Sequence, residues 1–401
     1  MSTILDYIAW RGDIPLSVSP FNEVDNLLLA ELSFLNFNGI VPPPELSHGI
    51  TMEEAARVYF ARHEGHEIDM GVLVPDKIPN MFCAMANTVR FSKMRLNSFL
   101  ERMDPIREQQ FAALTIDVGD GSIYVAFRGT DDTLIGWKED LNLSFLDRIP
   151  SQEEALRYLT RIARQYKDRP IRVGGHSKGG NLAVFSAVHA VAATQDRILA
   201  VYNNDGPGFF RRLIGTPEHT RIAKKILTIV PQSSIVGQLL EHEENVQVVH
   251  SFAEGMLQHD GFSWEVRGTE FVHLEDFSQE GKVFEGTMDA WAASLSVEQR
   301  EAFADALYEV LTGTGAKTLS ELNEEKLKSA VAILKTYQNL DRETRRALTG
   351  ALWLLVQVGA KNVAQNMGEN NLEPLRKTMK KKTAPPAKNA AEKPKRSVRD
   401  K

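Results

Sequence analysis

The sequence has almost no cysteine and no long uninterrupted apolar run. Its single cysteine, Cys83, excludes an internal disulfide and a zinc site built from cysteines. A membrane-spanning helix needs about 18 or more consecutive apolar residues. The longest candidate, residues 348–360, is interrupted by threonine, glutamine and glycine. The N-terminus also lacks the basic start of a secretory signal, so we expect a cytoplasmic protein.

The composition is that of an ordinary globular protein, with 43% hydrophobic and 25% charged residues. This balance excludes a mainly disordered, collagen-like or disulfide-rich chain. The length of 401 residues is compatible with two or three domains of roughly 150 residues each. One large α/β domain with appended helices fits the length equally well.

The net charge of −6 conceals a strong asymmetry along the chain. Residues 376–401 hold eleven Lys or Arg and two acidic residues (+9), which leaves 36 basic and 51 acidic residues (−15) in the remainder. Because this end has few large apolar residues, we predict a disordered basic tail over residues 373–401. The tail either aids solubility or contacts anionic lipid, nucleic acid or the acidic body. We expect no specific nucleic-acid binding.

The hydrophobic pattern changes near residue 109. Before it the chain reads as helical, including residues 22–37 and a helix at 52–64 capped by Thr51. After it, apolar strand candidates alternate with helices, and Asp120-Gly121 predicts a hairpin between residues 111–118 and 122–127. The later strand candidates are residues 171–174, 198–203, 226–230 and 246–251, with helices predicted at 152–166 and 181–193.

This alternation predicts an α/β fold whose mostly parallel central sheet is flanked by helices. The expected organisation is an N-terminal helical segment over residues 1–105, an α/β core over 106–283 and a C-terminal helical region over 284–372. Capping boxes at Ser296 and Thr318 mark helix starts in the last region.

Ser177 is the candidate nucleophile. It lies in Gly-His-Ser-Lys-Gly, directly after the strand at 171–174 and before a helix of small residues. A strand-to-helix turn of this kind exposes the serine, and its glycines remove Cβ atoms that the turn has no room for. A serine hydroxyl needs a base to take its proton.

His259 is the candidate base, because it follows the last strand candidate in a loop-like segment, as the histidine of α/β hydrolases does. His250 lies within an apolar run and His176 beside the nucleophile, so both are expected to be structural. His63 and His66 lack a metal-binding pattern and are expected at the surface. The sequence predicts no metal and no cofactor.

The oxyanion hole needs two donors. The backbone N–H of Lys178, directly after the nucleophile, is one candidate. Thr130, at the end of the strand at 122–127, is the other through its N–H and hydroxyl, although a plain strand-end turn explains it as well.

Several motifs in order make the sequence recognisable. The segment at 127–130 (FRGT), Trp137 with Asp140-Leu141, and the serine motif resemble the class 3 lipases. Adding Glu23-Val-Asp25, residues 230–236 (VPQSSIV) and Gln258-His259-Asp260, the chain resembles the Mbeg-like family of uncharacterised bacterial α/β hydrolases over about residues 1–270. The resemblance implies the α/β-hydrolase fold, Ser177 as nucleophile, His259 as base and Thr130 as oxyanion residue.

The chain departs from the lipase pattern at the triad acid. Residues 232–236 (QSSIV) contain no carboxylate where these lipases carry their aspartate. Asp205, at the end of the preceding strand, could serve instead, because neighbouring strand ends lie about 5 Å apart. A serine-supported dyad and an inactive site are the alternatives. Lys178, where lipases carry an apolar residue, places a charge beside the nucleophile.

These observations lead to a hypothesis and one alternative. The hypothesis is a serine esterase or lipase-like hydrolase that cleaves a carboxylic ester of a small molecule or lipid through an acyl-enzyme. The alternative is a non-catalytic hydrolase-fold scaffold, which the missing carboxylate favours.

Overall fold

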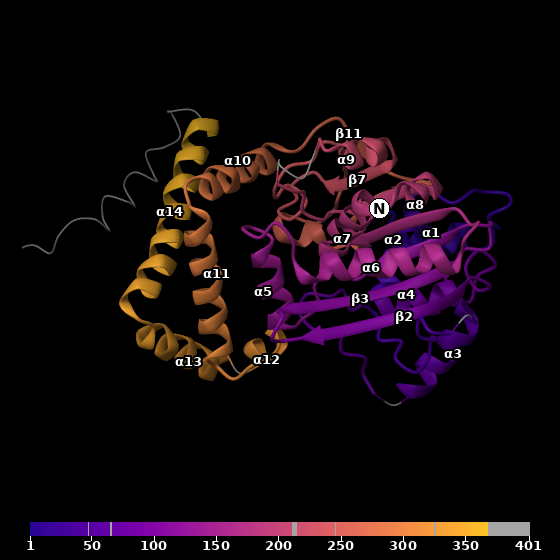
Figure 1. Cartoon of the computed structure of the whole chain (residues 1–401), viewed down its shortest axis with the longest axis horizontal. Coiled ribbons are helices and arrows are strands. Elements are labelled where there is room, and N and C mark those ends of the chain that lie inside the picture. The colour runs from indigo at the N-terminus through magenta and orange to yellow at the C-terminus, as the bar shows by residue number, and fades with distance from the viewer. Residues whose placement is uncertain (47, 65, 211–214, 245, 325, 368–401) are drawn as a thin grey trace, which may run out of the picture.

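A mixed sheet between two layers of helices forms the main body of the protein, and a further group of helices lies to one side (Figure 1). The computed structural model describes residues 1–46, 48–64, 66–210, 215–244, 246–324 and 326–367. Within them the main sheet has nine strands in the order β1 (Ile50–Thr51), β2 (Arg95–Asp104), β3 (Gln109–Asp117), β4 (Ile123–Phe127), β5 (Ile171–His176), β6 (Ile198–Asn204), β7 (Ile226–Pro231), β8 (Val246–Val249) and β11 (His273–Leu274). The short strands β9 (Val266–Arg267) and β10 (Glu270–Phe271) pair separately.

The centre of the main sheet is parallel. Strands β4 to β8 pair in parallel and in chain order, whereas β1 to β4 and the β8–β11 pair are antiparallel. The carboxyl ends of the parallel strands therefore meet at one edge, where ligands of such sheets bind. The predicted α/β-hydrolase fold, with a mostly parallel central sheet, is confirmed.

The two faces of the sheet bury alternate residues of each strand. On β4, Tyr124 and Ala126 face the N-terminal layer, while Ile123, Val125 and Phe127 face the other. The N-terminal layer holds α1 (Ile4–Arg11), α2 (Glu23–Glu31), η1 (Leu32–Phe34), α3 (Met52–Arg62) and α4 (Ile78–Ala86). The opposite layer holds α6 (Pro150–Gln165), α7 (Lys178–His189) and α9 (Pro217–Ile222), with α8 (Ala192–Arg197) and η2 (Ala223–Lys225) nearby.

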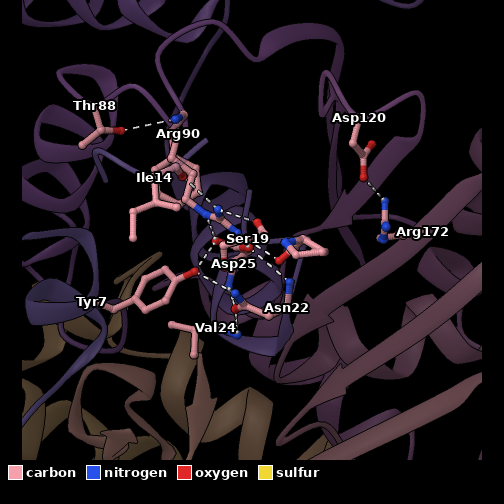
Figure 2. A network of polar contacts seen from close by, with 12 residues as sticks. Tyr7, Ile14, Ser19, Asn22, Val24, Asp25, Thr88, Arg90, Asp120 and Arg172 are labelled. Atoms are coloured by element: carbon pink, nitrogen blue, oxygen red, sulfur yellow. Dashed lines mark hydrogen bonds and ion pairs between the residues drawn. The ribbon is translucent and has the colours of Figure 1, made fainter. Parts of the chain in front are cut away.

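A buried ion pair holds the N-terminal layer together (Figure 2). The side chains of Arg90 and Asp25 are both fully buried, and two guanidinium nitrogens of Arg90 donate to the two carboxylate oxygens of Asp25. The Tyr7 hydroxyl also donates to Asp25 Oδ1, at 2.9 Å. The same guanidinium donates to the carbonyl oxygens of Ile14 and Ser19 at 3.1 and 2.9 Å. One arginine thus joins α2, the segment after α1 and the turn after α4.

The C-terminal helices form a unit with its own apolar core (Figure 1). They are α10 (Gln279–Ala293), α11 (Val297–Thr312), α12 (Leu319–Glu324), α13 (Lys326–Asn339) and α14 (Arg342–Met367). One contact of the unit with the main body is at α5 (Leu134–Asn142) and the turn after it, where Asp305 pairs with Lys138 and Arg300 donates to the Ser144 carbonyl oxygen at 2.6 Å. The tail predicted over residues 373–401 lies outside the described residues.

Local predictions and structure agree at most elements and differ at four, which are β1, β2, α5 and the start of α7. The hairpin at Asp120-Gly121, the Thr51 cap and the Ser296 capping box are present. The helical expectation for the first hundred residues is wrong at β1 and β2. The polar stretch before residue 142 contains α5, and the helix expected from residue 181 begins at Lys178.

Candidate active site

Ser177 lies on the sharp turn between β5 and α7. Its φ of 59° and ψ of −134° are a left-handed conformation that non-glycine residues rarely adopt and that proteins concentrate at functional sites. A Cβ atom on Gly175 would lie 2.3 Å from the backbone of Gly179, and one on Gly179 would lie 2.1 Å from the Phe127 carbonyl oxygen. Only glycine fits at these two positions, so this turn can form only where the sequence has the two glycines of the motif.

Asp205 and His259 form a hydrogen-bonded pair next to this turn. Asp205 Oδ2 lies 2.6 Å from His259 Nδ1. The strand residues His176 and Asn204 are partners in the β5–β6 register, so Ser177 and Asp205 follow matched positions on adjacent parallel strands. The carboxyl is fully buried, whereas the imidazole is 27% exposed. Because Nδ1 contacts Asp205, Nε2 is the atom through which His259 can exchange a proton.

The second oxygen of Asp205 is held by the segment after β7. Asp205 Oδ1 accepts hydrogen bonds from the Ser234 hydroxyl at 2.5 Å and from the Gly237 N–H at 3.1 Å. Burial raises the pKa of Asp205, and the hydrogen bonds from His259, Ser234 and Gly237 oppose that rise. The segment without a carboxylate therefore contributes donors that hold the carboxylate of the neighbouring strand.

The segment that carries Thr130 passes directly beside the serine. A Cβ atom on Gly129 would lie 3.1 Å from the Cβ atom of Ser177. The Thr130 hydroxyl donates to Asp140 Oδ2 at 2.5 Å, and the other Asp140 oxygen is buried without a hydrogen-bond partner among the described residues. Burial raises the pKa of Asp140 to about 6. Since the hydroxyl hydrogen is engaged, the backbone N–H of Thr130 is the donor that remains for an oxyanion.

The structure corrects the expectation for the Lys178 side chain. It is only 1% exposed and points into the protein, where Nζ donates to Glu139 Oε2 at 2.8 Å and to Gln110 Oε1 at 2.7 Å. Glu139 also accepts from the Ser151 N–H and hydroxyl. The charge is thus paired inside the protein, while the backbone N–H of Lys178 starts α7 next to Ser177.

Of the four other histidines named from the sequence, His176 contacts His259 and the remaining three have other partners. The His250 side chain is 36% exposed, and its Nδ1 lies 2.7 Å from Glu265 Oε2. His63 contacts the Tyr59 carbonyl oxygen and His66 is exposed. His176 is buried, and its Nε2 lies 2.8 Å from the His259 carbonyl oxygen.

The sequence did not predict the residues that contact the candidate site residues. Asp140 was visible as part of the Trp137–Asp140 motif, and its spacing from Thr130 was the available signal. Ser234 lies in the segment 232–236, whose sequence shows the missing carboxylate but gives no sign that this hydroxyl binds Asp205. Glu31 and Glu139 gave no local signal, because their partners are remote in sequence.

The described residues contain neither a cluster of metal-binding side chains nor a helix that could span a membrane. No group of three or more His, Cys, Asp or Glu residues there is arranged to hold a metal ion. None of the helices in these ranges is both long and apolar enough to cross a bilayer.

The ordered parallel strands, the glycine-flanked serine turn and the helices on both faces define a lipase-like α/β-hydrolase fold. The chain belongs to the Mbeg1-like family, which matches residues 85–309. No curated protein sequence matches the chain.

Solved lipase structures are similar to part of the chain. A Rhizomucor miehei lipase propeptide complex is 17% identical, with 39% of this chain and 57% of that chain covered and a TM-score of 0.30. Lipase II from Rhizopus niveus is 12% identical, with 42% and 70% covered and a TM-score of 0.34. A Yarrowia lipolytica lipase is 15% identical, with 46% and 70% covered and a TM-score of 0.28. The match thus spans less than two thirds of the Rhizomucor chain.

Proposed function

We propose that the protein is a serine hydrolase that cleaves a carboxylic ester by acyl transfer. The observation that carries the proposal is the 2.6 Å contact between His259 and the buried Asp205, beside a serine held at φ 59° on a strand-to-helix turn. A base oriented by a carboxylate next to such a serine is the arrangement that activates a hydroxyl.

The reaction assigns one role to each group. Ser177 Oγ attacks the ester carbonyl carbon while His259 Nε2 takes its proton, and Asp205 stabilises the imidazolium that forms. The backbone N–H groups of Lys178 and Thr130 donate to the oxyanion. His259 then returns the proton to the leaving alcohol, and water releases the acyl group from Ser177 by the same steps.

The scaffold alternative depended on the missing carboxylate after β7. Asp205 supplies a carboxylate at the same histidine from the neighbouring strand end, and Ser234 and Gly237 hold it. The absence of a carboxylate after β7 is therefore no longer an argument for a non-catalytic protein.

Fluorophosphonate labelling followed by nitrophenyl esters of increasing chain length tests the proposal. We expect one labelled residue, Ser177, and the ester panel should report the acyl length that the site accepts. The Ser177→Ala variant should lose labelling and about 10⁶ of turnover. Ser92→Ala, which changes another partly buried serine, is the matched control and should behave as wild type. Folded wild-type protein that neither labels nor hydrolyses any ester would refute the proposal.

A further inference from the structure

A second buried pair, Glu31 and His176, lies behind the proposed catalytic residues. Glu31 ends α2 with a side chain that is 0% exposed, and His176 ends β5 with a side chain that is 5% exposed. Glu31 Oε1 lies 3.3 Å from His176 Nδ1. Neither carboxyl oxygen of Glu31 has a hydrogen-bond partner among the described residues, and the ionisable groups that act on it are this imidazole and the Asp260 carboxyl, whose charge also raises the pKa of Glu31. The proposed reaction assigns the pair no step.

The contacts of His176 define where its proton lies. Its Nε2 lies 2.8 Å from the His259 carbonyl oxygen, which can only accept, so Nε2 carries the hydrogen. In a neutral ring Nδ1 is then an acceptor, and a carboxyl facing it makes a hydrogen bond only when the carboxyl is protonated. Burial acts in the same sense, because it raises the pKa of Glu31 well above its ordinary value and lowers the pKa of His176 well below.

We propose that Glu31 is a positioning residue that works as a neutral acid. Its O–H donates to His176 Nδ1 and fixes the tautomer in which His176 Nε2–H holds the His259 main chain. This inference rests on the proposed function, since it assigns a purpose to the pair through His259. The pair carries one proton on the carboxyl and one on Nε2, and it has no net charge.

Two consequences for the reaction follow from this arrangement. The His176 side chain holds the base, and its backbone continues into Ser177, so one residue sets the distance between base and nucleophile. The rings of His176 and His259 are 4.5 Å apart between centroids. A neutral His176 does not repel the imidazolium that His259 becomes during the attack, whereas a charged one would.

Nitrogen-15 NMR of histidine-labelled wild-type protein tests the tautomer directly. We expect His176 to show an unprotonated Nδ1 and a protonated Nε2, with no titration between about pH 5 and pH 9. A protonated Nδ1, or titration of the ring in that interval, would overturn the proposal. This readout does not use activity. A protein with the expected tautomer but no hydrolysis would therefore refute the proposed function and leave the assignment of the pair intact.

Two Glu31 variants separate positioning from mere packing. Glu31→Gln keeps an N–H donor for His176 Nδ1, so its kcat should stay within about threefold of wild type. Glu31→Met keeps the volume but has no donor, and misplacement of the base should lower kcat about 10²-fold with little change in KM. Equal losses in both variants would contradict the proposal.

The pH profile gives a third readout. The acid limb of kcat/KM should be the same in Glu31→Gln as in wild type, because a neutral acid is replaced by a neutral amide. If Glu31 were ionised, its removal would destabilise the His259 imidazolium, and the acid limb would move to lower pH. Such a shift would overturn the neutral-acid assignment even if the Met variant failed to fold.

A different observation concerns the outer helices α13 and α14. Five large apolar side chains on them are exposed: Val331 (68%), Leu334 (56%), Leu352 (46%), Trp353 (54%) and Val356 (54%). Leu348 and Ala351 of α14 are buried in the core of the C-terminal unit, so one side of α14 already has its partners. Leu352, Trp353 and Val356 lie within about one helical turn on its outer side. Figure 1 shows α14 along the edge of the molecule that is remote from the sheet.

These apolar side chains lie in the basic part of an acidic chain. Residues 326–367 contain seven Lys or Arg and residues 376–401 contain eleven, against six acidic residues over 326–401, which gives +12. The remaining 29 basic and 47 acidic residues give −18 for residues 1–325. An exposed tryptophan beside aliphatic and cationic side chains is typical of a helix that lies on an anionic membrane surface.

We propose that the outer side of α14, defined by Leu352, Trp353 and Val356, docks on an anionic membrane surface. The apolar side chains enter the interface, and the basic groups of residues 326–401 attract the anionic headgroups. Each basic group near such a surface strengthens binding roughly fivefold, and salt weakens the attraction. This proposal does not depend on the hydrolase activity.

Sedimentation with lipid vesicles tests the docking surface. The full-length protein should bind phosphatidylcholine vesicles that contain about 30% phosphatidylserine, with binding that decreases as salt is raised, and should not bind pure phosphatidylcholine vesicles. Trp353→Ser with Val356→Ser should weaken binding more than tenfold. Val191→Ser, a matched change at a side chain that is 67% exposed elsewhere, should have no effect. Equal binding to both vesicles, no binding, or an unaffected double variant would overturn the proposal.

Discussion

At the scale of single residues, Asp205 is the residue on which the proposed triad depends. It adopts φ 51°, a left-handed conformation that aspartate tolerates better than most residues. Asp205 directly follows β6, and both of its carboxyl oxygens are hydrogen-bonded, one to His259 and the other to Ser234 and Gly237. A carboxylate fixed on both sides can hold the imidazole in one tautomer.

Replacing Asp205 by asparagine should lower turnover by about 10⁴, because an amide does not stabilise the imidazolium. Ser234→Ala removes one donor and keeps the acid, so we expect a loss of about tenfold or less. Ser233→Ala should be near wild type, since its hydroxyl contacts the Ser278 hydroxyl at 2.5 Å and not the carboxyl. Steady-state kinetics on folded variants measures all three. A large loss in Ser233→Ala with Asp205→Asn near wild type would move the third triad member to the segment after β7.

Asp140 should make stability depend on pH. Its pKa is about 6 in the folded protein against 3.8 ordinarily, so folding favours the protonated acid. The stability that this group adds is complete below about pH 4 and is lost as the pH rises through about 6, by roughly 3 kcal/mol in total. Urea unfolding of wild type and Asp140→Asn should therefore give a difference that declines over this interval and is constant above it. A difference that does not vary with pH would contradict the assignment.

At the scale of elements, the features that could be predicted are those with a signal in the local sequence. The β3–β4 hairpin has Asp120-Gly121, and the β5–α7 turn has its glycines, so the sheet centre and the turn that carries Ser177 could be predicted. The contact between Asp205 and His259 joins two candidates named from the sequence, and their roles stay a prediction. Strand β2 was hidden because its register shifts between Asn97 and Leu100, which breaks the alternation of buried and exposed residues. Helix α5 was hidden because its consecutive charged residues are buried by remote partners.

The Arg90–Asp25 pair should be the main polar contributor to the stability of the N-terminal layer. Arg90→Ala leaves the Asp25 carboxylate buried without its cation, which should lower the free energy of unfolding by about 3–5 kcal/mol in urea denaturation. Arg90→Met combined with Asp25→Asn should cost less than Arg90→Ala alone, because no buried charge is left. The exposed Lys93–Glu53 pair is the control, and Lys93→Ala should cost less than about 1 kcal/mol. Equal costs for Arg90→Ala and Lys93→Ala would contradict this ranking.

At the scale of the whole molecule, α5 is the place where the C-terminal helices meet the sheet, because it packs against both α11 and β3. Main-chain bonds join it to the C-terminal unit, from the Leu134 N–H to the Lys317 carbonyl oxygen at 2.9 Å and from the Leu319 N–H to the Asp132 carbonyl oxygen at 3.0 Å. Both Asp132 and Leu134 lie within a few residues of Thr130. The C-terminal helices are therefore anchored on the segment that also supplies the proposed oxyanion donor.

The charged run in α5 constrains how the length of this segment can vary. Lys138, Glu139 and Asp140 are consecutive, and each contacts a different part of the protein: Asp305, Lys178 and Thr130 respectively. One inserted residue turns the following part of a helix by about 100°, so an alanine inserted before Lys138 would direct each charge to the wrong partner. Such an insertion should abolish both activity and cooperative unfolding. The same insertion at the hairpin tip, between Asp120 and Gly121, should be tolerated. We therefore expect natural relatives to vary in length at the hairpin and to keep the length of α5 constant.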